Sequence, residues 1–120
     1  MLLRNCSTGE VIAADVQFAT SFLHRTVGFL TKRHIPPSEG IWFPNACMIH
    51  TLGMRSTIDV IFLDASNSVM QLKAGVRPNR LAVPCIGAAS VIELGAGALE
   101  SNDVLVGDRL ALEECLAGTT

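Results

Sequence analysis

The sequence is poor in charged and aromatic residues. Charged side chains make up 17% of the 120 residues and aromatic side chains 5%, with one Trp and no Tyr. The charged fraction is below the usual quarter of a globular domain, and the formal net charge is only −2. This composition argues against intrinsic disorder, a coiled coil and a basic nucleic-acid-binding surface. We therefore expect no nucleic-acid partner.

Targeting and membrane-spanning signals are also missing. The apolar start of the chain is interrupted by Arg4, before the hydrophobic core of a secretory signal could form. No uninterrupted apolar run approaches the roughly 20 residues that cross a bilayer. We expect no membrane span and a soluble, cytoplasmic protein with a single β-rich domain over residues 1–120.

Four cysteines are present, but their spacing matches no metal or redox motif. Cys6, Cys47, Cys85 and Cys115 lie 41, 38 and 30 positions apart, whereas zinc and redox sites use closely spaced pairs such as C-x-x-C. We interpret them as reduced thiols that lie mostly in the core, and we expect no cofactor.

Short apolar runs separated by turn residues indicate a mainly β fold. One amphipathic helix is predicted from Thr20 to about Arg33, because apolar residues recur there every three or four positions and Pro36 forbids continuation. We expect a compact, jelly-roll-like β-sandwich or barrel with one α-helix packed across it. The predicted strands are Leu2–Arg4, Glu10–Asp15, Ile41–Phe43, Ala46–Leu52, Ile58–Leu63, Val69–Val76, Ala89–Leu94 and Val104–Leu112.

Two acidic residues stand inside apolar strands. Asp59 interrupts Ile58–Leu63, and Glu93 lies within a similar run. A buried charge needs a partner, and Arg25 and Arg55 are the candidate cations. The groups could form a structural clasp between helix and sheet, or they could line a pocket for a polar ligand. Acid–base catalysis by the two carboxylates would require them to lie about 5–10 Å apart with divergent pKa values.

The segment Cys47–Met54 suggests two further possibilities. A nucleophilic pair of Cys47 and His50 is disfavoured, because residues three apart on a strand project from opposite faces. Met48 and His50 share a face, and Met54 could return to them, which would give soft ligands suited to Cu(I). The chain carries no P-loop, H-E-x-x-H or G-x-S-x-G motif.

An ordered series of blocks over about residues 12–112 resembles the uncharacterised bacterial and archaeal family known as domain of unknown function 192. The blocks are Thr20–Arg33, Gly40–Phe43, His50–Arg55, Ile58–Asp64, Val91–Leu94, Gly97 and Val106–Asp108. The resemblance implies a compact β-rich, jelly-roll-like domain without an established enzyme activity.

We therefore expect a non-catalytic module rather than an enzyme. It would bind a small polar ligand or a partner protein. A hydrolase using Asp59 and Glu93, and a copper site at Met48, His50 and Met54, are the alternatives. The predicted ligand-binding residues are Arg25, His50, Thr51, Arg55, Asp59 and Glu93.

Overall fold

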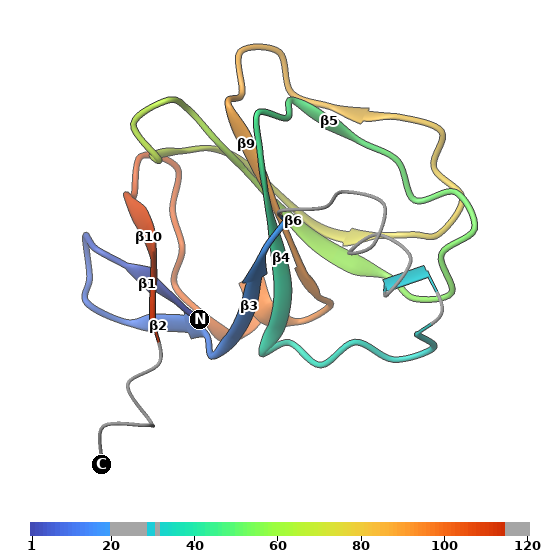
Figure 1. Ribbon diagram of the computed structural model, residues 1–120, viewed down its shortest axis with the longest axis horizontal. Coiled ribbons are helices and arrows are strands. Elements are labelled where there is room, and N and C mark those ends of the chain that lie inside the picture. The colour runs from blue at the N-terminus through green and yellow to red at the C-terminus, as the bar shows by residue number, and fades with distance from the viewer. Residues whose placement is uncertain (20–28, 31, 115–120) are drawn as a thin grey trace.

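The computed structural model describes residues 1–19, 29–30 and 32–114, and within them the chain is mainly β (Figure 1). Ten strands and one short helix lie wholly within this part of the chain. The strands are β1 (Leu2–Asn5), β2 (Val11–Ala13), β3 (Asp15–Phe18), β4 (Glu39–Pro44), β5 (Met48–Ile49), β6 (Ile58–Leu63), β7 (Val69–Val76), β8 (Val83–Pro84), β9 (Ser90–Gly95) and β10 (Leu110–Glu113), and the helix is α2 (Ala98–Ser101).

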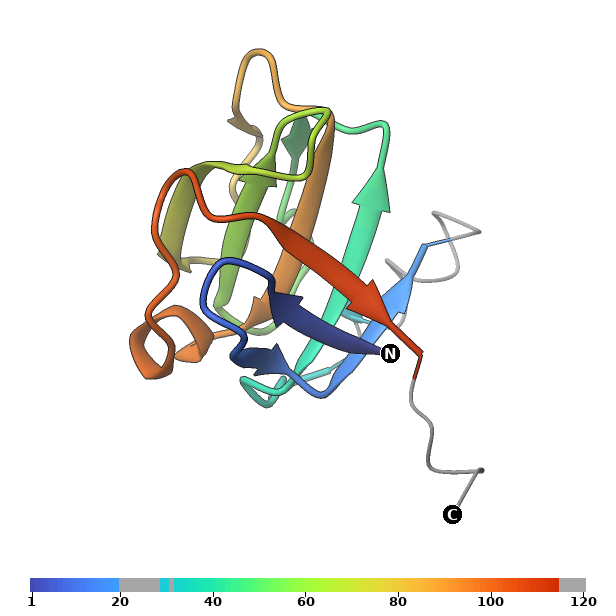
Figure 2. The ribbon, with the colours of Figure 1, turned by 90° about the vertical axis from the view of Figure 1, so that its left-hand side faces the viewer.

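The described strands form three open sheets. A five-stranded sheet has the order β3-β4-β9-β6-β7, and only its β3–β4 pair is parallel. A three-stranded sheet, β10-β1-β2, packs across one face of it, as Figure 2 shows with β1 and β10 in front of the larger sheet. The third sheet is the two-stranded pair β5-β8. The layers explain why apolar and turn-forming residues alternate in short blocks along the chain.

The five-stranded sheet is buried on both faces. In β6 every residue is buried, and alternate side chains of a strand point to opposite faces. Ile61 and Leu63 join the cluster beneath the three-stranded sheet, together with Leu3 and Leu110 from that sheet. Loops and the β5-β8 pair cover the other face, whose cluster contains Ile35, Ile49, Met54, Ile58, Val60 and Val83.

The mainly β prediction is confirmed, and β6 and β7 have the predicted bounds. The predicted strand Glu10–Asp15 was wrong in detail, because the chain forms two strands there that join different sheets. The strand expected at Ala46–Leu52 is paired only at Met48–Ile49, and α2 was not predicted. The predicted helix over 20–33 falls largely outside the described residues, of which Phe29 and Leu30 are helical. Closure of the sheets into a jelly roll or barrel stays a prediction.

None of the described helices has the length and apolar character that crossing a membrane requires.

The backbone at Gly95 passes very close to the backbone of Ile35 and Pro36. A Cβ atom on this residue would lie 2.0 Å from the Pro36 carbonyl oxygen and 2.3 Å from that of Ile35. Because backbone cannot swing aside as a side chain does, Gly95→Ala should lower the free energy of unfolding by about 3 kcal/mol in urea titrations. Gly9→Ala is the control: its Cβ would meet nothing within 4 Å, so only its positive φ costs stability, about 1 kcal/mol. Equal losses in the two variants would contradict the crossing.

Candidate functional site

The carboxylate of Asp59 is a structural junction in the middle of β6. It is 1% exposed, and its Oδ1 accepts a hydrogen bond from the Gly75 backbone N–H at 2.9 Å. Its Oδ2 accepts from the N–H groups of Gly97 and Leu99 at 3.2 and 2.9 Å. Backbone donors of this kind compensate a buried charge without a cationic partner. Asp59 thus ties β6 to β7 and to the first residues of α2.

A β-bulge in β7 directs one of these donors. Between the pairs Ile58↔Val76 and Val60↔Lys73, β6 has one residue and β7 has two. The extra residue lets Gly75 adopt a φ of 68°, a left-handed conformation that glycine enters without steric cost. The bulge therefore turns the Gly75 N–H toward the carboxylate.

Glu93 lies on the opposite face of the same sheet. It pairs with Val60 of β6 and Ile41 of β4, whose side chains belong to the cluster beneath the loops, whereas Asp59 pairs with Leu94 on the other face. Glu93 is 7% exposed, and its carboxyl group has no hydrogen bond or ion pair within the described residues. Burial raises the pKa of Glu93 from its ordinary 4.5 to about 8. Its carboxyl group is thus predominantly neutral at pH 7.

The two acids therefore do not meet. Directly paired residues of adjacent strands share a face, so the sheet itself separates the Asp59 carboxylate from that of Glu93. Asp59 is also held by its three backbone donors. This arrangement does not support the acid–base pair of a hydrolase. Arg25, the cation expected to join them, lies outside the described residues, and Arg55 is exposed.

Thr51 closes a second structural junction, in the loops that flank β5 and β8. It is fully buried, and its hydroxyl donates to the Arg77 carbonyl at 2.7 Å and accepts from the Arg80 N–H at 2.8 Å. The Asn79 N–H donates to the Thr51 carbonyl at 2.7 Å, and the Asn79 side chain accepts from Gly53. We call this set of bonds the Thr51 clasp. It joins two loops that have only a two-residue ladder of their own.

The other predicted residues lie around the clasp without converging. His50 is exposed, and its Nδ1 accepts from the Leu52 N–H at 3.3 Å. Met48 is exposed as well, but Met54 is buried in the core cluster with Ile49. The three soft ligands proposed for copper are thus not gathered at one point. Ligand contacts by His50, Thr51, Arg55 or Glu93 remain predictions.

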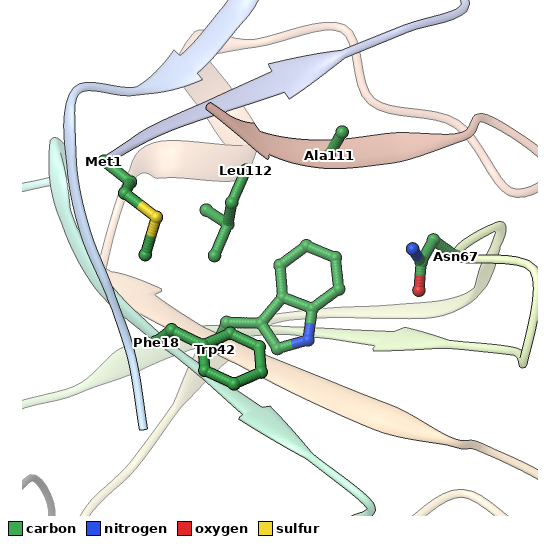
Figure 3. Close-up of a pocket in the computed structure, with 6 residues that line it drawn as sticks. All are labelled: Met1, Phe18, Trp42, Asn67, Ala111 and Leu112. Atoms are coloured by element: carbon green, nitrogen blue, oxygen red, sulfur yellow. The ribbon is translucent and has the colours of Figure 1, made fainter. Parts of the chain in front are cut away.

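A hollow lined by described residues lies elsewhere, between the two larger sheets (Figure 3). It has a volume of about 430 Å³ and adjoins a second hollow of about 260 Å³, with which it shares Phe18, Trp42 and Asn67. We call the two together the Trp42 groove. The first hollow is lined by Met1, Phe18, Trp42, Asn67, Ala111 and Leu112, and the second adds Pro44, Asn45, Asp64, Ala65, Ala89 and Ser90.

The Trp42 groove has an apolar floor and a polar end. Trp42 is 6% exposed and Phe18 39% exposed, and Figure 3 shows their rings side by side with Leu112 directed toward them. The indole nitrogen lies on the side of the groove where Asn67 stands. Neither this N–H nor the side chains of Asn67 and Ser90 have a hydrogen-bond partner within the described part of the chain. Such a surface can hold a ligand by apolar contact and orient it by a few hydrogen bonds.

Sequence reasoning missed this groove. It assigned no functional role to Phe18, Trp42 or Asn67, although Trp42 is 6% exposed. The one local signal was the turn Asp64–Ser68, where Asn67 has a φ of 63° and its side chain projects from the loop. The lining residues come from the N-terminus, β3, β4, β9, β10 and the β6–β7 turn, so only the sheet packing brings them together.

The chain belongs to the DUF192 family, whose model, described as "Uncharacterized ACR", matches residues 3–112. A UPF0127 protein of Pyrococcus furiosus is 34% identical over 113 residues, which cover 88% of this chain and 93% of the relative. A UPF0127 protein of Thermococcus sibiricus is 32% identical over 116 residues, covering 93% and 75%. The resemblance inferred from the sequence blocks is thereby confirmed, and the match extends almost to the N-terminus.

Two crystal structures share the fold. A Sinorhizobium meliloti protein, named as a proposed transcription regulator, has a TM-score of 0.74 at 22% identity and covers 92% of this chain and 89% of its own. A Novosphingobium aromaticivorans protein of unknown function has a TM-score of 0.75 at 19% identity, with coverages of 92% and 82%. At these identities the likeness establishes the fold alone.

The Asp59 junction can be tested with Asp59→Asn. An amide nitrogen cannot accept hydrogen bonds, so the variant leaves at least one of the three backbone donors unsatisfied, and we expect a loss of about 2–3 kcal/mol in urea unfolding. Asp64→Asn is the matched control, because both backbone donors to that side chain, from Ser66 and Ser68, use the same Oδ1, which an amide retains. Its loss should stay below about 1 kcal/mol. Similar losses in both variants would contradict the junction.

The burial of Glu93 predicts a pH-dependent stability. Between about pH 4.5 and 8 the unfolded state has released this proton and the folded state retains it, so stability falls as pH rises, by up to about 1.4 kcal/mol per unit, and levels off above pH 8. Glu93→Gln is neutral throughout and should remove this slope. Unfolding free energies from pH 4.5 to 9 would measure it, with the exposed Glu10→Gln as control. Parallel profiles for wild type and Glu93→Gln would contradict the assignment.

Proposed function

We propose that the protein is a non-catalytic module that binds a small, uncharged polar ligand in the Trp42 groove. The observation that carries the proposal is an apolar floor together with hydrogen-bonding groups at one end that have no partner among the described residues. A flat apolar portion of the ligand would lie against Phe18 and Trp42. A carbonyl or hydroxyl group would accept from the indole N–H or the Asn67 amide.

The charge of the lining supports an uncharged ligand. Among the described residues that line the groove none is Lys, Arg or His, and the Asp64 carboxylate lies at its polar end. An anionic ligand would face this carboxylate, and the α-amino group of the lining residue Met1 already donates to the Val16 carbonyl at 2.9 Å. A neutral amide or alcohol has no such cost.

The alternatives have weaker geometric support. A hydrolase would need Asp59 and Glu93 on one face, and a copper site would need Met54 beside Met48 and His50. Binding of a partner protein through the embedded acids and arginines stays a prediction. The groove is favoured because its polar groups already converge on one space.

The proposal can be tested by following the indole N–H of Trp42. Because the chain has one Trp, this group gives a single resonance in a ¹H–¹⁵N spectrum. Benzamide combines a flat ring with an uncharged amide, and we expect it to shift this resonance with a Kd of about 1–10 mM. Benzoate, its charged counterpart, should bind at least several-fold more weakly.

Two variants and a control locate the binding. Phe18→Ala removes part of the floor, and Asn67→Gly removes the amide while permitting the positive φ, so each should weaken benzamide binding by about tenfold. Leu52→Ala shortens a side chain that is 42% exposed, close to the exposure of Phe18, but lies outside the groove, and should leave the Kd unchanged. An unshifted indole resonance, or equal weakening in all three variants, would refute the proposal.

A further inference from the structure

Cys47 and Cys85 occupy directly opposite positions across the β5-β8 pair. The register joins Met48 to Pro84 and Ile49 to Val83, and continuing it by one residue joins the two cysteines. One backbone hydrogen bond joins them beyond the ladder, because the Cys85 N–H donates to the Cys47 carbonyl at 2.8 Å. Directly opposite residues of an antiparallel pair have Cα atoms about 4.5–5.5 Å apart and side chains on the same face. Disulfides span Cα separations of about 4.4–6.8 Å.

Both thiols are free, and they differ in accessibility. Cys47 is exposed, whereas Cys85 is half-buried and packs against the core cluster that includes Ile49 and Val83. A reagent in solution can therefore reach Cys47 first, while Cys85 stands across the ladder as the second thiol. This is the arrangement of an attacking and a resolving cysteine.

We propose that Cys47 and Cys85 are a redox-sensitive pair that forms an intramolecular disulfide when the protein meets a low-molecular-weight disulfide such as oxidised glutathione. The Cys47 thiolate attacks one sulfur of the reagent, forming a mixed disulfide and releasing one reagent thiol. The Cys85 thiolate then attacks the Cys47 sulfur, and the second reagent thiol leaves. Two protein thiols lose two electrons and two protons in total, and the reagent is reduced to two thiols.

The new bond would reinforce loops that have little strand pairing of their own. The loops around β5 and β8 are held by a two-residue ladder and the Thr51 clasp. A covalent link between Cys47 and Cys85 would close the long chain segment between them and reduce the conformational freedom of the unfolded state. The oxidised protein should therefore melt at a higher temperature than the reduced protein, by about 5–10 °C.

The test uses the full chain with Cys6→Ser and Cys115→Ser, which leaves Cys47 and Cys85 as the only thiols. After incubation with oxidised glutathione at pH 8 and alkylation with iodoacetamide, the intact mass should show the loss of two hydrogens, without glutathione or alkyl groups. Peptide mapping should link Cys47 to Cys85. Two glutathione adducts per chain, a disulfide-linked dimer, or a lower melting temperature after oxidation would overturn the proposal.

A matched control keeps two thiols that are not paired. The variant Cys85→Ser with Cys115→Ser retains Cys6, in the turn after β1, and Cys47, beside β5, and Figure 1 places these two regions on opposite sides of the molecule. Because both remaining thiols are exposed, it should end with one glutathione on Cys6, one on Cys47 and no internal disulfide. An internal bond in this variant would show that oxidation does not report the native register, and would equally overturn the assignment.

Discussion

The fold depends on how one buried carboxylate is compensated. β6 is the interior strand against which β7 and β9 pair, and Asp59 puts a charge at a position that is closed to water. The charge is tolerated because three backbone N–H groups, from two separate segments, converge on it. The carboxylate in turn supplies acceptors for the N–H at the bulge and for two N–H groups at the start of α2. The bulge in β7 and the turn before α2 therefore both serve to stabilise the buried charge in β6.

The same sheet explains which parts of the structure can be read from sequence. The bounds of β6 and β7 follow from two apolar runs separated by the turn Asp64–Ser68, which is local information. β8 is two residues long and exists only through its pairing with β5, and α2 is too short to display a helical period. Such elements are created by tertiary contacts, so no window of sequence contains them.

Candidate sites depend on tertiary contacts even more than short strands and helices do. Alternation along one strand correctly places Asp59 with Ile61 and Leu63, but whether Glu93 shares their face depends on the register between β6 and β9. A slip of one residue would have reversed the answer. The residues of the Trp42 groove raise the same difficulty, because Phe18, Trp42, Asn67 and Leu112 belong to four separate segments and form no motif. The acid embedded in β6 thus marks a structural junction. The Trp42 groove is formed by the packing of the sheets and has no signal in any one segment.

One face of the five-stranded sheet is covered by the three-stranded sheet, and the other is covered mainly by loops. Where a three-stranded sheet lies across five strands, the smaller layer leaves an edge uncovered, and the Trp42 groove lies between the two layers at that edge. Where loops form the cover, their backbone groups lack a continuous ladder and must be satisfied individually, as Thr51 does with its hydroxyl and both backbone groups. A cover of this kind is more easily opened than a strand layer. Cross-links between its loops therefore have a larger effect on local stability there than they would in the sheets.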